Sequence, residues 1–203
     1  MKPCPFGEHL QHYWDRLTDL EQQMALDEEA LYSLTPQAVA TEIATTLTGT
    51  RVADVFCGAG GLTIALARAG KQVLASDTSS ARLEMARENA RLFDVSERIE
   101  FRQGDVREIL PTLAPDSVLL DPPWGGTDYG KRDQFRLADF EPDGTELLRL
   151  SFSQTPQVAM RLPKNFVMSE LNDVGHAYEL QENFFEGGLL HYCVYFGGNP
   201  RPS

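Results

Sequence analysis

The stretch V-A-D-V-F-C-G-A-G-G, residues 52–61, sets the pattern that most of the chain follows. Its first half, Val52–Phe56, is short, apolar and typical of a buried strand. The glycines that follow let the backbone turn tightly and approach a ligand closely. Residues 62–69 then predict a helix that stops at Gly70. A strand, a glycine turn and a helix in this order predict the first unit of a parallel α/β sheet.

The same alternation continues downstream, with a helix at residues 81–93 capped by Ser79 or Ser80. Further apolar stretches predict strands at residues 72–76, 99–103, 117–120 and 158–162. Strands 178–185 and 189–196 are so close in sequence that they must pair antiparallel. We therefore expect an α/β fold with a doubly wound, mostly parallel seven-stranded sheet closed by an antiparallel hairpin. This arrangement resembles the Rossmann-like fold of class I methyltransferases.

The first fifty residues differ in character from the rest, with two basic residues against eight acidic ones. Thr35 and Pro36 predict the start of a helix, with Thr35 as the N-cap and Pro36 at the first helical position. An apolar stripe follows at Val39, Ile43 and Leu47. We interpret residues 1–50 as a helical extension packed on the core and residues 51–203 as the methyltransferase domain.

The composition excludes collagen-like and disordered chains. Of the 203 residues, 42% are apolar and 24% charged, an ordinary globular mix. No apolar run approaches the roughly 18 residues that span a bilayer, and no signal peptide opens the chain. We expect a monomer of the cytoplasm, or of the nucleus if the source is eukaryotic, that is neither secreted nor membrane-bound.

The charge balance limits how this chain can hold nucleic acid. Eighteen basic and 30 acidic residues give a net charge of −12, which disfavours a broad, sequence-independent grip on phosphates. A nucleic-acid substrate must then be held locally. The three cysteines cannot all pair and show no ligand spacing with the histidines. We expect a reducing compartment and no metal.

Acidic residues stand at the ends of three successive predicted strands. Asp77 follows the second strand, where a carboxylate can take both hydroxyls of a ribose. Asp105 can accept from an adenine amino group, and Asp54 can meet an ammonium group directly or through water. The G-x-G-G spacing from Gly58 fits neither the dinucleotide fingerprint nor a phosphate loop. The three strand-end carboxylates beside the glycine turn together predict a site for S-adenosylmethionine, which is cationic and has no phosphate. For any one of these acids alone, a loop cap is the better interpretation.

The most specific motif is Asp121-Pro122-Pro123-Trp124-Gly125-Gly126, directly after a predicted strand. Proline has no N–H, so this segment presents carbonyls and the Asp121 carboxylate as acceptors around one point. Such a cradle suits an exocyclic amino group on an aromatic base, and Trp124 supplies a face on which the base stacks. The predicted catalytic residues are Asp121, Pro122 and Trp124. The alternative is a rigid turn with a buried tryptophan.

Five cations near this motif can meet substrate phosphates: Lys131, Arg132, Arg136, Arg161 and Lys164. The alternative is that these cations lie on a solvated surface. For Arg136 and Arg161 this alternative stays open.

Over nearly its whole length the chain resembles the trimethylguanosine synthase family, the cap guanine-N2 methyltransferases. His12-Tyr13-Trp14 is similar to the family's K-Y-W, and Tyr32–Pro36 to its aromatic-S-x-T-P segment. Asp54–Gly61 matches D-x-F-C-G-x-G-G, Asp121–Tyr129 resembles S-P-P-W-G-G-P-D-Y, and Leu162–Asn165 resembles L-P-R-N. Two further segments, at 182–184 and 195–197, resemble its closing hairpin.

The resemblance implies stacking of 7-methylguanine on Trp124, cofactor binding by Asp54 and Asp77, and phosphate contact by Lys164. The complete set of cofactor candidates is Thr35, Asp54, Phe56, Cys57, Gly58, Gly60, Asp77 and Asp105. The substrate candidates are Trp124, Lys131, Arg132, Lys164 and Asn165.

Two positions depart from the family pattern. Asp121 stands where the family has serine, and Ala25 where it places a lysine for the cap triphosphate. The sequence predicts an S-adenosylmethionine-dependent methyltransferase for the N2 amino group of guanine, at a 7-methylguanosine cap, an RNA 5′ end or a guanine nucleotide. The first alternative is a guanine N2 or adenine N6 methyltransferase acting within RNA or DNA. The second is a cofactor- or RNA-binding module without catalysis.

Overall fold

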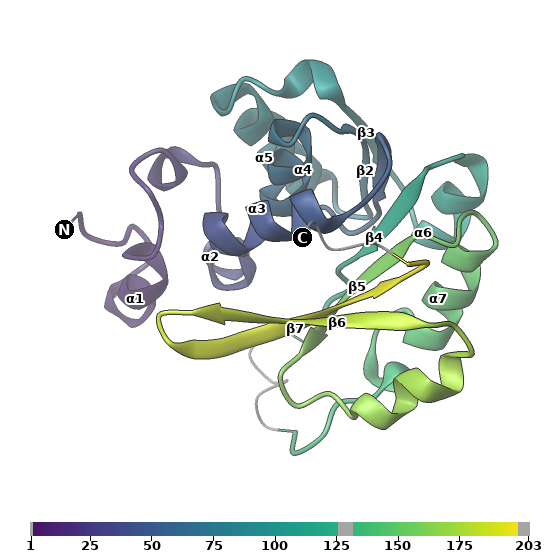
Figure 1. Cartoon of the computed structure of the whole chain (residues 1–203). Helices are drawn as coiled ribbons and strands as arrows, with labels where there is room; N and C mark the ends of the chain where they lie inside the picture. The colour runs from purple at the N-terminus through teal and green to yellow at the C-terminus, as the bar shows by residue number, and fades with distance from the viewer. Residues whose placement is uncertain (1, 126–131, 199–203) are drawn as a thin grey trace.

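One mixed sheet of seven strands organises the residues described by the computed structural model, 2–125 and 132–198. Its strand order is β3-β2-β1-β4-β5-β7-β6 (Figure 1). Strands β1 to β5 run parallel, and β7 lies antiparallel between β5 and β6. The strands are β1 (Arg51–Asp54), β2 (Gln72–Asp77), β3 (Ile99–Gln103), β4 (Ser117–Leu120), β5 (Val158–Pro163), β6 (Tyr178–Phe185) and β7 (Gly188–Phe196). The predicted fold class is confirmed.

Helices cover both faces of this sheet (Figure 1). The α-helices are α1 (Gln11–Trp14), α2 (Glu28–Ser33), α3 (Gln37–Thr46), α4 (Gly61–Arg68), α5 (Ser80–Leu92), α6 (Val106–Ile109) and α7 (Gly144–Phe152). Short 3₁₀ segments are η1 (Glu8–Leu10), η2 (Glu21–Gln23), η3 (Ser96–Arg98), η4 (Leu110–Thr112), η6 (Leu137–Asp139) and η7 (Met168–Val174).

Neighbouring residues of the central strands enter different cores, because side chains alternate across a strand. Val52 and Leu119 pack with α3, α4 and α5 on one face of the sheet. Ala53 and Val118 pack with α6 and α7 on the other. The central strands are therefore apolar throughout, as expected for a sheet covered on both sides.

The start of α3 differs from the prediction that Thr35 caps it and Pro36 is its first residue. Pro36 has ψ of 139°, outside the helical range, so the helix begins at Gln37 and has no side-chain cap. Thr35 is consequently one position too early to reach the first free N–H groups. At α5, by contrast, Ser79 is the cap and accepts from Arg82 N at 3.3 Å.

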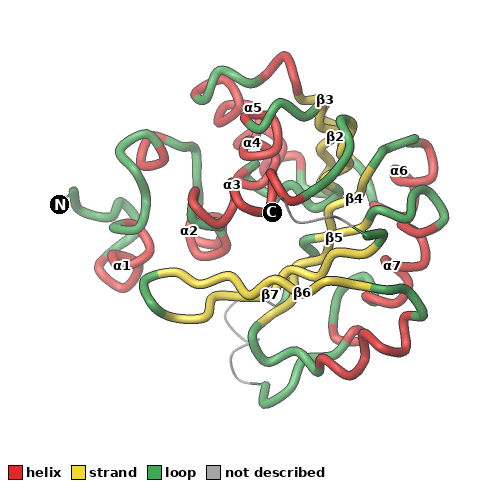
Figure 2. The backbone as a smooth tube through the Cα atoms, viewed as in Figure 1, coloured by secondary structure: helices red, strands yellow, loops and turns green. Residues whose placement is uncertain are grey.

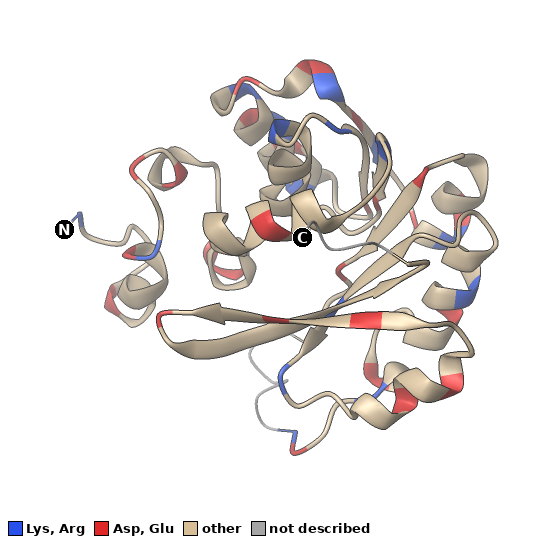
Figure 3. Cartoon of the chain, in the orientation of Figure 1, with Lys and Arg blue, Asp and Glu red and all other residues tan. Residues whose placement is uncertain are grey.

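The extension before α3 has a small core of its own, formed by Cys4, Leu10, Trp14, Leu17 and Leu31. The β6–β7 hairpin extends toward α1 (Figure 2). Arg16 Nε of the extension lies 3.5 Å from Glu186 Oε2 at the hairpin turn. Acidic residues outnumber basic ones in the part of the chain before α3 (Figure 3). The proposed boundary at residue 50 stays a prediction, and α3 packs in the main core.

A buried asparagine fastens the extension to the sheet domain. Asn89 on α5 is 1% exposed. Its Oδ1 accepts from Ala25 N at 2.7 Å, and its Nδ2 donates to Ala25 O at 3.0 Å and to Ala59 O at 2.8 Å. One side chain thus joins the extension to the glycine turn.

Asn89→Leu is expected to lower the stability of the protein by about 3 kcal/mol, because it leaves buried backbone groups without partners. That corresponds to a fall in Tm of roughly 6–12 °C for a chain of this size. The exposed Glu88 on the same helix provides the control, since Glu88→Gln should change stability by less than about 0.5 kcal/mol. Equal melting temperatures for the two variants would show that Asn89 does not fasten the extension.

Candidate active site

A cavity of about 1060 Å³ lies at the carboxyl ends of the parallel strands, where open α/β sheets bind ligands. It is bordered by the glycine turn after β1, the ends of β2 and β3, the segment after β4, the extension and β7. The predicted residues that line it are Thr35, Phe56, Cys57, Gly58, Asp77, Asp105, Asp121, Pro122 and Trp124. Cofactor candidates and catalytic candidates therefore share one cavity.

The glycine turn takes a backbone conformation that other residues adopt only with strain. Gly58 has φ of 52° and Gly60 has φ of 92°. A Cβ on Gly60 would also come within 3.2 Å of the Ala86 Cβ, so this glycine lets α4 and α5 approach. At Gly58 a Cβ would meet nothing within 4 Å, which leaves open space on the cavity side.

Asp77 at the end of β2 is held by backbone donors. Its Oδ2 accepts from Gly58 N at 3.0 Å and its Oδ1 from Ser79 N at 2.9 Å. Each oxygen of an ionised carboxylate can accept more than one hydrogen bond. Asp77 therefore fixes the turn and keeps acceptor capacity toward the cavity that it lines.

Asp54 at the end of β1 is 1% exposed and is not among the residues that line the cavity. Its Oδ2 accepts from Thr63 Oγ1 at 2.5 Å, whereas its buried Oδ1 has no partner among the described residues. Burial, together with the negative charges of Asp121 and Asp77, raises the pKa of Asp54 from its ordinary value of 3.8 to about 7, although the hydrogen bond from Thr63 opposes this rise. The unpartnered oxygen is an acceptor suited to a cation or to a water that a cation binds.

Asp105 caps α6 and is engaged by Arg107. Its Oδ1 accepts from Arg107 N and Nε, each at 2.8 Å, and its Oδ2 from Arg107 Nη2 at 2.6 Å. These bonds lower the pKa of Asp105 to about 2. Asp105 lines the cavity as an ionised acceptor, and its contact with an adenine stays a prediction.

The segment after β4 places Asp121 beside a buried cation. Arg161 Nη1 donates to Asp121 Oδ2, and the Arg161 guanidinium carbon lies 5.2 Å from the centre of the Trp124 ring. The Asp121 side chain remains 21% exposed, so a ligand can reach it. Burial raises the pKa of Asp121, and the charge and hydrogen bond of Arg161 oppose that rise.

The interpretation of Arg161 as part of a solvated surface is wrong, whereas its contact with a substrate phosphate stays a prediction. Arg161 is 6% exposed, because it lies on β5 in the middle of the sheet and pairs with Asp121. A signal was present in the sequence: Arg161 stands inside the apolar stretch V-A-M-R-L-P, and a charge in a buried strand requires a partner.

His191 on β7 is a cavity residue that sequence reasoning missed. It is fully buried, and its ring centre lies 6.3 Å from that of Trp124. Neither ring nitrogen has a partner among the described residues. Burial, with Arg161 nearby, lowers the pKa of His191 to about 2, so the imidazole is neutral. No local sequence pattern marks His191 as a cavity residue, because its position in the cavity depends on contacts between residues far apart in sequence.

The substrate candidates other than Trp124 do not line the cavity in the described part of the chain. Arg132 pairs with Asp139 at 2.5 Å, and Asn165 Nδ2 donates to Arg132 O at 2.8 Å. Lys164 is exposed on the segment after β5. Lys131 lies outside the described residues. The phosphate-binding roles of these residues stay predictions.

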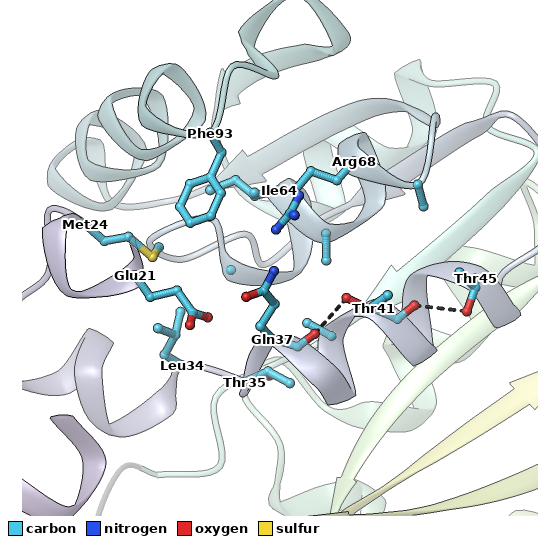
Figure 4. A pocket seen from close by; sticks show the side chains of 14 residues that line it. Glu21, Met24, Leu34, Thr35, Gln37, Thr41, Thr45, Ile64, Arg68 and Phe93 are labelled. Carbon is cyan, nitrogen blue, oxygen red and sulfur yellow. Dashed lines mark hydrogen bonds between the residues drawn. The ribbon is translucent and has the colours of Figure 1, made fainter. Parts of the chain in front are cut away.

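A smaller cavity of about 310 Å³ lies between η2, α3, α4 and the end of α5 (Figure 4). Thr35 lines both cavities. The hydroxyls of Thr41 and Thr45 are engaged by backbone carbonyls one turn earlier in α3, at 2.8 and 3.0 Å. Apart from Thr35, this cavity holds none of the predicted site residues.

The fold, with its cavity at the carboxyl ends of the parallel strands, is that of a class I methyltransferase. Residues 49–198 match the family model described as RNA cap guanine-N2 methyltransferase. The chain belongs to this family, as its motifs predict.

Relatives and solved structures agree with this assignment. The trimethylguanosine synthase of Schizosaccharomyces pombe is 31% identical, over 97% of this chain and 91% of that protein. The trimethylguanosine synthase of Saccharomyces cerevisiae is also 31% identical, over 75% of this chain and 51% of its own length. A methyltransferase structure from Porphyromonas gingivalis W83 has a TM-score of 0.75 at 20% identity, covering 94% of this chain and 49% of its own, and shows the shared fold.

Two features are absent from the described residues. No helix there is long and apolar enough to cross a bilayer. No cluster of three or more histidine, cysteine, aspartate or glutamate side chains there is arranged to hold a metal ion.

Proposed function

We propose that the protein transfers a methyl group from S-adenosylmethionine to the exocyclic N2 amino group of guanine in a 7-methylguanosine cap or a cap-like RNA end. The observation that carries this proposal is the single cavity with Asp77 and the glycine turn at one side and Asp121 to Trp124 at the other. Family membership supports the same reaction.

The residues present fit S-adenosylmethionine. Asp77 offers carboxylate oxygens to the ribose hydroxyls, and the unpartnered Oδ1 of Asp54 suits the ammonium group or a water bound to it. The open space beside Gly58 leaves room for the cofactor chain. When bound, this cofactor supplies an electrophilic methyl group on a sulfonium.

The protein's contribution to the reaction is orientation. Trp124 stacks the base, and Asp121 accepts a hydrogen bond from the amino group. The nitrogen lone pair, otherwise delocalised into the ring, is thereby directed at the methyl carbon. When bound, the cofactor would supply the methyl group that this nitrogen receives, and Asp121 would accept the proton that the nitrogen releases. Orientation of this kind lowers barriers by roughly 7–11 kcal/mol.

Asp121 itself favours a second candidate, a methyltransferase for an amino group inside RNA or DNA. A carboxylate at this position gives D-P-P-W in place of the family's S-P-P-W. A methyl-transfer assay with GTP, 7-methyl-GTP, a cap dinucleotide and unmodified RNA separates the two. We expect 7-methylated guanine to be the better substrate, whereas methylation of unmodified RNA alone would favour the second candidate.

Trp124 variants test whether the stacked base is cationic. Cation–π attraction contributes about 0.5–2 kcal/mol, and tryptophan is its best partner. We expect the affinity for 7-methyl-GTP to fall from wild type to Trp124→Phe to Trp124→Ala, with larger losses than for GTP. Fluorescence or calorimetric titration with both ligands measures this. Equal losses for the two nucleotides would indicate generic stacking.

Asp54 makes cofactor binding dependent on pH. Its raised pKa means that the Asp54 carboxyl holds its proton more tightly in the folded protein than in the unfolded chain. The contribution of Asp54 to the free energy of unfolding therefore falls as pH rises from about 4 to about 7. An ammonium ligand favours the ionised form, so S-adenosylhomocysteine should bind about 10-fold more tightly at about pH 7 than at about pH 5.5.

Asp54→Asn should bind this ligand weakly and remove most of that pH dependence, as calorimetry at several pH values can determine. The exposed Asp94 supplies a control, because Asp94→Asn should retain the wild-type profile. The same pH profile in Asp54→Asn and wild type would exclude Asp54 from the ammonium site.

A further inference from the structure

Arg161 contacts both residues that the proposed transfer step uses. Its Nη1 donates to Asp121 Oδ2, and its guanidinium carbon lies 5.2 Å from the Trp124 ring centre. The side chain is 7% exposed and extends from a strand whose residues are all buried. One rigid, planar group thus links the acceptor to the stacking surface.

Stability does not account for a cation at this position. A buried ion pair loses much of its attraction to desolvation, and apolar residues of similar volume often do as well or better. Met160 and Leu162, the neighbours of Arg161 on β5, are apolar and fully buried. Moreover, Arg161 Nε is buried and has no partner among the described residues, which is a further cost.

The groups around Asp121 show that ionisation of the Asp121 carboxyl depends on Arg161. Asp54, at the end of β1, is coupled to Asp121 through like charge. From β7, Cys193 and His191 lie near Arg161, and both are neutral, because burial raises the pKa of Cys193 to about 12 and lowers that of His191 to about 2. Among the described groups that act on the Asp121 carboxyl, Arg161 is the only cation.

We propose that Arg161 is the positioning residue of the transfer site: it keeps the Asp121 carboxylate ionised and aimed at the amino group, and it holds the Trp124 ring beside it. This inference rests on the proposed function, because it takes Asp121 as the acceptor in the transfer step.

Removal of the Arg161 charge has a defined direction of effect. An opposite charge within about 4–6 Å lowers the pKa of an aspartate by about 1–3 units, so Arg161→Met raises the pKa of Asp121. A protonated Asp121 accepts poorly. The acidic limb of the rate profile therefore moves to higher pH by about 1–3 units.

A double-mutant cycle tests whether Arg161 acts through Asp121. The four proteins are wild type, Asp121→Ser, Arg161→Met and the double variant, and the measurement is the single-turnover rate on 7-methyl-GTP with saturating cofactor. We expect Arg161→Met to lower the rate about 10–100-fold near pH 7 in the wild-type background. In the Asp121→Ser background the same change should cost less than about 3-fold.

Two further variants sharpen the test. Arg161→Lys keeps the charge but loses the planar fork, so it should keep the acidic limb near its wild-type position while losing part of the rate. Arg102, which pairs with Glu100 on β3, is the matched control, and Arg102→Met should leave the rate and the profile unchanged.

Folding is checked on the same proteins by calorimetric affinity for S-adenosylhomocysteine. The double variant removes both charges, so it is expected to fold even if Arg161→Met is unstable. Rate losses that add across the cycle, or an acidic limb that stays in place in Arg161→Met, would overturn the role of Arg161.

A readout without substrate separates this inference from the proposed function. In protein with ¹³C-labelled aspartate, NMR titration should show the Asp121 midpoint about 1–3 pH units higher in Arg161→Met than in wild type. An unchanged midpoint would contradict the inference. A wild-type protein that methylates none of the guanine nucleotides would contradict the proposed function instead.

Discussion

Asp77→Ala is expected to weaken S-adenosylmethionine binding about 100-fold or more while the protein remains folded. Hydrogen bonds to a charged group contribute about 1.5–3 kcal/mol each, and the Asp77 carboxylate is placed to take two ribose hydroxyls. The same carboxylate accepts from Gly58 N and Ser79 N, so its loss also loosens the glycine turn.

Calorimetry gives the affinity, and thermal unfolding without ligand shows whether the variant is folded. Asp77→Asn is the informative companion, because an amide preserves the shape but offers one acceptor oxygen where the carboxylate offers two. It should fall between wild type and Asp77→Ala. Wild-type affinity in folded Asp77→Ala would remove Asp77 from the cofactor site.

The second large effect is expected at Asp121. Asp121→Asn should lose mostly kcat, by about 100-fold, because the amide is a weaker acceptor and places a donor where the base also donates. Asp121→Ser should retain more activity than Asp121→Ala, since a hydroxyl can still accept from the amino group and occupies this position in the family.

All three substitutions leave the buried Arg161 without an opposite charge, so each should also lower Tm. Stability alone is therefore not diagnostic, and the rate of the folded fraction is. Single-turnover rates and thermal unfolding on the same preparations distinguish the two roles. A lowered Tm with an unchanged rate would identify Asp121 as a loop cap and exclude it from catalysis.

Local sequence pattern was sufficient for most of the sheet. The observed bounds of β3, β4 and β6 are those predicted. β4 is a short, mostly apolar stretch, whereas β3 and the first half of β6 alternate apolar with polar residues, as half-buried strands do. The strand-end position of Asp77 also followed from chain order, since parallel strands end at one edge of the sheet.

The rest depended on contacts between residues far apart in sequence. In the sequence Asn89 is an ordinary helical residue. Its role depends on the hydrogen bond of its side chain with Ala25, which is 64 positions away. His191 has no local signal, and only the pairing of β7 with β5 brings it to the cavity. The burial of Arg161 does not follow from its charge, which is typical of a surface residue, but its apolar strand requires a partner such as Asp121.

Methyl transfer to the N2 amino group of guanine can be observed directly. The protein is supplied with S-adenosylmethionine carrying a ¹³C-labelled methyl group and with 7-methyl-GTP, and NMR locates the label in the product. We expect the labelled methyl to be bonded to N2, with coupling to the adjacent base carbon. A labelled methyl on N1 or O6, or no labelled nucleotide while an adenine-containing RNA is methylated, would contradict it.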